Sequence, residues 1–119
     1  MLYEVFVRLY KEGKEYDNEE MYIAERGWQD WMDRYAGGDD SMTVIALLKL
    51  IYKLSKMTLR EMRGDLSRVE FEQKYKIPSM SLKNWEVGKR EAPEYVQCMI
   101  AYVIFNDMWI NGNNGKDTN

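Results

Sequence analysis

The sequence predicts an all-α fold, in which only residues 2–10 fit a short β-strand as well as they fit a helix. Over most of the chain, apolar residues recur at three- and four-residue spacing, the period of a helix buried on one side. Ser, Thr, Asp or Asn precede several of these stretches, and Gly or Pro follows some of them, as at helix starts and ends. The 119 residues suit one domain with a modest core.

Residues 2–10 carry two overlapping patterns. One face of a helix would contain Leu2, Val5, Phe6 and Leu9. Alternate residues from Tyr3 onward fit one face of a strand, and their Tyr and Val content favours that alternative. A single strand would need a partner strand, either nearby in the chain or from another subunit. Helix and strand both stay open here.

A polar, acidic stretch leads into a second expected helix. Asp17 or Asn18 can cap this helix, which we expect to run through the aromatic residues that follow, with Gly27 as a point of interruption. The Gly- and Asp-rich residues 36–40 predict a turn. This turn is the best internal boundary, and it would close an acidic, aromatic-rich amino-terminal extension of residues 1–40.

Four large side chains of that second helix would share one face because of their three- and four-residue spacing. They are Trp28, Trp31, Met32 and Tyr35. We expect this face to pack on the core. Its composition also suits a surface for a protein partner, with Asp30 and Asp33 at the polar rim.

A strongly apolar helix is predicted after the turn. Asp40 or Ser41 can cap it, and it runs from Met42 to about Ser55. Because it is apolar almost all round, we expect it to be buried on several sides as the central helix of a helical domain spanning residues 41–110.

The last helix is predicted from about Glu94 to Trp109. It carries more apolar surface than one small core needs, so part of it can form a dimer interface. Residues 111–119 consist of Gly, Asn, Thr and charged residues without apolar side chains, which predicts a disordered tail.

Residues 59–93 predict two short helices joined by a tight turn. Ser67 and Glu70 have the three-residue spacing of a capping box at the start of the first helix. Residues 76–78 end that helix, because their Pro fixes φ, lacks an amide proton and biases the preceding residue away from helical angles. Ser79 can cap the second helix. Two short helices crossing at such a turn form a helix-turn-helix.

Residues on both sides of this motif also carry signals for helix starts and ends. Thr58 to Arg63 is expected to form a short preceding helix, Gly88 ends the second motif helix, and Pro93 suits the first turn of the next. The residues expected to be buried are Val69, Phe71, Tyr75, Leu82 and Trp85. Those expected to stay outside are Met80, Ser81, Lys83 and Asn84.

At these residues the chain resembles the Xre/lambda-repressor-like helix-turn-helix family, over about its middle third. The likeness rests on these residues: Leu66-Ser67, Glu70-Phe71, Ile77, Leu82, Trp85-Glu86 and Gly88-Lys89. The chain departs from the family at Glu72, where a small residue is usual, and in a shorter link between Arg63 and Leu66.

The resemblance implies that the second motif helix lies in the major groove of double-stranded DNA. By position, the residues facing bases would be Ser79, Met80, Lys83 and Asn84. Those holding phosphates would be Arg68, Lys89 and Arg90. Lys suits the guanine acceptors, Asn the adenine edge and Met a thymine methyl. The resemblance also implies a partly buried ion pair between Glu86 and Arg63.

The charge distribution agrees with a DNA-binding motif at this place. The net charge is −3, yet residues 56–91 carry 9 basic and 6 acidic groups. Residues 1–55 carry 7 basic and 11 acidic groups, and residues 92–119 carry 1 and 3. The positive excess therefore falls on the motif, as the electrostatic footprint of a nucleic-acid interface does.

Composition argues against an enzyme. There is no histidine, which removes the commonest acid–base group and the commonest metal ligand. The single cysteine, Cys98, lies in an apolar helical pattern and is expected to be a buried, inert thiol. We therefore expect no catalytic, metal or cofactor site. The sequence shows neither an apolar run of membrane-spanning length nor a signal-peptide pattern, so we expect a soluble intracellular protein.

Two functions from different classes follow. The leading hypothesis is a sequence-specific DNA-binding transcriptional regulator, a repressor that binds a near-palindromic operator as a homodimer in the cytoplasm of a bacterial or phage-infected cell. The alternative is a protein-interaction or inhibitor module of a phage or mobile element, of the anti-CRISPR or antitoxin type. In that case the aromatic surface of residues 1–40 would bind a protein partner.

Overall fold

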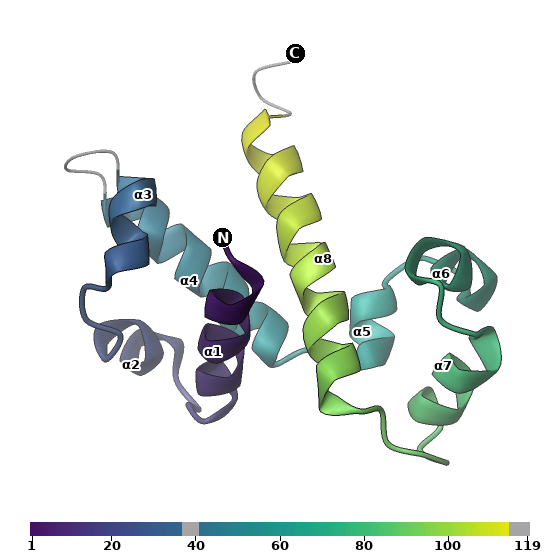
Figure 1. Ribbon diagram of the computed structural model, residues 1–119. Coiled ribbons are helices and arrows are strands. Elements are labelled where there is room, and N and C mark those ends of the chain that lie inside the picture. The colour runs from purple at the N-terminus through teal and green to yellow at the C-terminus, as the bar shows by residue number, and fades with distance from the viewer. Residues whose placement is uncertain (37–40, 115–119) are drawn as a thin grey trace.

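The protein is described by a computed structural model, which covers residues 1–36 and 41–114. In this part of the chain all regular structure is helical and no β-strand occurs, so the all-α prediction is confirmed (Figure 1). The helices are α1 (Tyr3–Lys14), α2 (Glu19–Ala24), the 3₁₀-helix η1 (Asp30–Met32), α3 (Asp33–Ala36), α4 (Ser41–Ser55), α5 (Leu59–Arg63), α6 (Arg68–Tyr75), α7 (Ser79–Glu86) and α8 (Glu94–Asn114). The predicted turn at 37–40 and the candidate cap Asp40 lie outside the described residues.

Helix α8 separates two groups of helices. Helices α1 to α4 lie on one side of it, whereas α6 and α7 lie on the other (Figure 1). Helices α1, α4 and α5 contact α8, α5 contacts α7, and α6 contacts α7. Helix α5 therefore links the α6–α7 pair to α8, and Lys74 of α6 also forms an ion pair with Asp107 of α8 at 2.9 Å.

Residues 3–14 form helix α1, so the strand alternative is wrong. The buried residues of α1 include Phe6, Leu9 and Gly13, whereas Leu2, at the start of the predicted stripe, is 63% exposed. At Gly13 a Cβ atom would lie 2.6 Å from the Ser55 hydroxyl oxygen, so α1 approaches α4 too closely for a larger residue. Burial of these α1 residues outweighs the strand preference of Tyr and Val, which depends on context.

The expected long aromatic helix is broken into separate pieces. Asn18 caps α2 as predicted, its Oδ1 accepting from the Met21 amide at 3.0 Å, but α2 ends at Ala24. Gly27 has a φ of +62°, a backbone conformation that favours glycine and that a helix cannot contain. A single helix through to Tyr35 is therefore wrong, and the chain resumes with η1 and α3.

Helix α4 matches its predicted range and supplies much of the core, contacting α1, α2, α3 and α8. The buried core residues form one cluster across both groups of helices: Phe6, Leu9, Tyr10, Tyr22, Met32, Val44, Leu47, Leu48, Ile51, Tyr52, Leu54, Met62, Phe71, Leu82, Cys98, Ile100, Ala101 and Phe105. Helix α5 begins after the predicted break, at the Thr58 cap, and ends at Arg63 as predicted.

Helix α8 starts where predicted, since the Pro93 carbonyl accepts from the amides of Val96 and Gln97. It continues to Asn114, so the predicted disordered tail began too early, and residues 115–119 lie outside the described part. Cys98 is buried in this helix, and burial raises the pKa of its thiol. Within residues 1–36 and 41–114, no helix is both long enough and apolar enough to cross a bilayer.

Candidate functional site

The candidate site is built on α6, the connection of residues 76–78 and α7. Helix α6 starts with the predicted capping box: the Glu70 amide donates to Ser67 Oγ at 3.0 Å, and the Ser67 amide donates to Glu70 Oε1 at 2.8 Å. The helix ends where predicted, at Lys76, whose φ of +59° and ψ of +34° are left-handed. The connection therefore turns the chain sharply before α7.

The inner side of α6 differs in part from the prediction. Phe71 is buried and Tyr75 is half-buried, and their rings pack with centroids 4.4 Å apart. Val69 was expected to be buried but is 61% exposed. The reason is geometric: residues two apart, such as Val69 and Phe71, point about 200° apart around a helix and cannot share a face.

The start of α7 is held by a residue of α6 and not by the predicted Ser cap. Pro78 occupies the cap position, and Ser79 is the first helical residue. Glu72 Oε1 accepts from the Ser79 amide at 2.6 Å and from the Ser79 hydroxyl at 2.7 Å. These hydrogen bonds, the hydroxyl first, hold the pKa of the Glu72 carboxyl below its usual range. Glu72, the departure from the family pattern, thus ties α6 to α7.

Helix α7 has one buried side, as predicted, but of the four residues expected to stay outside, Ser81 and Asn84 are half-buried. Leu82 is fully buried and Trp85 is half-buried against the core. On the other side, Met80 is 64% exposed and Lys83 is exposed, while Asn84 is half-buried. Within the described part of the chain, the Lys83 ammonium has no ion-pair partner.

The end of α7 exposes two basic side chains. Gly88 has a φ of +81°, and the amides of Lys89 and Arg90 donate to the Asn84 carbonyl at 2.9 and 3.3 Å. This closing turn leaves both basic side chains exposed, and neither pairs with a carboxylate in residues 1–36 and 41–114.

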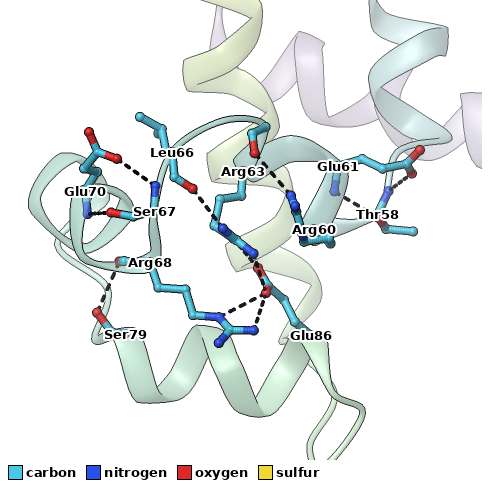
Figure 2. A network of polar contacts seen from close by, with 11 residues as sticks. Thr58, Arg60, Glu61, Arg63, Leu66, Ser67, Arg68, Glu70, Ser79 and Glu86 are labelled. Carbon is cyan, nitrogen blue, oxygen red and sulfur yellow. Dashed lines mark hydrogen bonds and ion pairs between the residues drawn. The ribbon is translucent and has the colours of Figure 1, made fainter.

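A carboxylate with two arginines connects α5, α6 and α7, as Figure 2 shows. Arg63 Nε donates to Glu86 Oε2 at 2.8 Å, and Arg63 Nη2 donates to Glu86 Oε1 at 3.0 Å. The implied ion pair is therefore present, with the Glu86 side chain only 4% exposed. Hydrogen bonds from Arg63 are the main cause that lowers the pKa of Glu86, and they outweigh the opposing effect of burial.

Arg68 is the second partner of Glu86, which the sequence did not predict. Its Nη2 donates to Glu86 Oε1 at 3.0 Å, and its Nε donates to the same oxygen at 3.2 Å (Figure 2). Its side chain is 36% exposed, so part of it still reaches solvent. Arg68 was predicted to hold a phosphate, but in the structure its guanidinium is bonded to Glu86.

The candidate partner surface does not exist as one exposed face. Met32 is buried, whereas Trp31 and Tyr35 are half-buried against the core. Only Trp28 is largely exposed, and its indole N–H donates to Asp33 at 2.8 Å. The break at residues 25–29 removes the common helical face that the spacing predicted, and core packing holds for three of the four side chains.

The described residues contain no group of three or more His, Cys, Asp or Glu side chains that could hold a metal ion. Comparisons with protein-family models, with curated protein sequences and with solved structures found no match to this chain. What can be inferred about function therefore rests on the α6–α7 pair and its surroundings.

Proposed function

We propose that this protein is a sequence-specific DNA-binding transcriptional regulator, in which α6 and α7 form a lambda-repressor-like helix-turn-helix and α7 reads base edges in the major groove. The observation that supports this proposal most is that α7 is held at both ends while part of its surface is exposed. The helix is held at its start by Glu72 and at its end by Glu86, and it points exposed, unpaired side chains outward. A helix fixed in this way can enter a groove without first being ordered.

The charges near α7 support the same proposal. Lys83, Lys89 and Arg90 are exposed and lie on or next to the helix, in the one section of the sequence with a positive excess. Lys83 and Asn84 can hydrogen-bond to base edges, and Met80 can pack on a thymine methyl. Lys89 and Arg90 would bind phosphates and set the position of α7 without reading sequence.

The regulator would act as a homodimer whose two α7 helices meet successive major grooves of a near-palindromic operator. A groove between α6 and α8 suits the interface, and it is lined by Lys74, Tyr75, Ile77, Tyr95, Val96, Met99, Ile100 and Val103. Tyr95, Met99 and Val103 are exposed and follow one another at four-residue spacing along α8. Such an apolar stripe, which is slightly inclined to the helix axis, can pack on the same stripe of a second copy across a two-fold axis.

The experiment is a selection from a random double-stranded DNA library with the purified protein, followed by sequencing. We expect an enriched, near-palindromic motif whose half-sites are about 10 bp apart, or a multiple of that spacing. Recovery of unenriched sequences, with uniform weak affinity for all duplexes, would contradict the proposal. In that case a function through a protein partner would replace it.

A further inference from the structure

Glu72 occupies the amino terminus of α7, where a helix ordinarily attracts an anion. The first amides of a helix lack internal partners and carry partial positive charge, so phosphates bind there readily. Here the Glu72 carboxylate already accepts from the Ser79 amide at 2.6 Å and from its hydroxyl at 2.7 Å. The Ser79 hydroxyl also lies 3.2 Å from the carbonyl oxygen of Arg68, so the start of α7 contacts the start of α6 as well.

This carboxylate stays charged and lies at the surface. Glu72 is exposed, and it borders a shallow hollow together with Gln73, Lys76 and Pro78. The hydrogen bonds from Ser79 lower its pKa, so it is ionised at neutral pH. A DNA phosphate that approached the start of α7 would meet the negative charge of Glu72 and would find the Ser79 amide already bonded.

We propose that Glu72 is a specificity-determining residue, which excludes a phosphate from the amino terminus of α7 and so weakens sequence-independent DNA binding. This inference rests on the proposed function. Non-specific binding consists almost entirely of phosphate contacts, whereas specific binding adds contacts to base edges. The Glu72 carboxylate therefore weakens non-specific binding, in which a phosphate would lie at the start of α7, more than it weakens specific binding, in which α7 lies in the major groove.

Glu72→Gln tests the proposal, because the amide oxygen can still accept from Ser79 while the charge is removed. Asp65→Asn is the matched control: Asp65 is exposed, lies in the same basic section, and makes no ion pair within the described residues. Both variants change the net charge by the same amount. Affinity would be measured for the selected operator duplex and for a random-sequence duplex over a range of salt concentrations.

We expect Glu72→Gln to tighten binding to the random duplex by roughly two- to fivefold, the Coulomb effect of one charge on a nearby phosphate. Operator binding should change less, so the specificity ratio falls. The log–log salt slope on the random duplex should steepen by about 0.9, as one further phosphate is bound. Asp65→Asn should leave the specificity ratio unchanged.

Equal effects of Glu72→Gln on both duplexes, or the same effects from Asp65→Asn, would overturn the inference. If a thermal melt shows that Glu72→Gln does not fold, Glu72→Ala takes its place, since it also removes the charge and supplies the small residue usual for the family. If the wild-type protein prefers its operator and the variants have the same specificity ratio as the wild type, this inference is wrong and the proposed function stands. Wild-type protein without any operator preference defeats the proposed function and this inference with it.

Discussion

Glu86 is the residue on which three helices depend, because its buried carboxylate binds Arg63 of α5 and Arg68 of α6. Removing one partner of a buried ion pair leaves an uncompensated charge, and this costs far more than losing an exposed pair. A single side chain at the end of α7 therefore contributes to the stability of the contacts among α5, α6 and α7.

Glu86→Ala should lower the free energy of unfolding by about 3 kcal/mol, since it leaves a largely buried arginine without its carboxylate. Arg63→Ala should cost less, because Glu86 keeps Arg68. Arg68→Ala should cost least, at about 1 kcal/mol or below, since this guanidinium is partly solvated. Chemical denaturation of the three variants would check this order. Glu91→Ala, an exposed carboxylate, is the control, and a cost for Glu86→Ala no larger than that of the control would contradict it.

The same carboxylate predicts a pH dependence of stability. The pKa of Glu86 is lower in the folded protein than in the unfolded chain, mainly because Arg63 hydrogen-bonds to the charged form. Its contribution is then complete above the unfolded value of about 4.3 and is lost as the pH falls through the folded value. The stability gap between wild type and Glu86→Gln should be constant from about pH 6 to 8 and should narrow as the pH falls below about 4. A gap that widens on acidification would contradict this sign.

Residue-level features could be predicted where they depend on near neighbours in the sequence. The Ser67–Glu70 capping box is such a case, and Thr58–Glu61 has the same spacing and also forms one. The Arg63–Glu86 pair was implied only by the family resemblance. The bonds of Glu72 to Ser79 and of Arg68 to Glu86 have no sequence signal, because they depend on how two helices cross.

At the scale of elements, α7 is the helix whose fixed position gives the proposed site its geometry. Its start, its end and its buried side are each held by a different residue: Glu72, Glu86 and Leu82. Of the residues predicted to meet DNA, Ser79 and Arg68 help to hold the helix, whereas the side chains of Met80, Lys83 and Asn84 do not. Substitutions on the open side should therefore separate binding from folding.

Substitutions in the turn that ends α7 should change DNA binding without changing folding. Replacing Lys89 and Arg90 together by Ala should weaken binding to all DNA sequences alike, because phosphate contacts carry no sequence information. The log–log salt slope should become shallower by about 0.9 for each phosphate that the variant no longer binds. Binding titrations at several salt concentrations measure this slope. Lys49 and Lys53 of α4 are exposed, so their double Ala variant is the charge-matched control. A slope that changes equally in both would remove residues 89 and 90 from the interface.

The elements themselves were predicted well where apolar periodicity is long and unbroken, as in α4 and in residues 94–109 of α8. The segment from Asn18 to Tyr35 was predicted poorly. Its aromatic spacing suits a helix, but the positive φ of Gly27 divides it, and a glycine within a helical pattern does not by itself reveal that angle. For residues 2–10, packing on α4 and α8 favours the helix over the strand, and these contacts cannot be read from the local sequence.

At the scale of the whole molecule, the apolar stripe on α8 predicts self-association. Met99→Glu places a charge on an exposed position of this stripe and should shift a dimer to monomer without unfolding the chain. Light scattering at micromolar concentration, with and without operator DNA, measures the outcome. Met42→Glu is the matched control, because Met42 is 71% exposed at the start of α4. Wild-type protein that stays monomeric even on DNA would defeat the dimer proposal.

The central claim, that α7 reads DNA sequence, is tested most directly by competition binding of Lys83→Ala and Asn84→Ala against single-base variants of the selected operator. Lys83 is exposed, so its replacement should change the unfolding free energy by no more than about 0.5 kcal/mol. Asn84 is half-buried, so the unfolding free energy of its variant is measured alongside its binding. Each variant should lose roughly 1–3 kcal/mol of discrimination at one base position and keep it elsewhere. Lys49→Ala should lose none. If both α7 variants preserve the wild-type ranking of the operator variants, α7 does not read DNA.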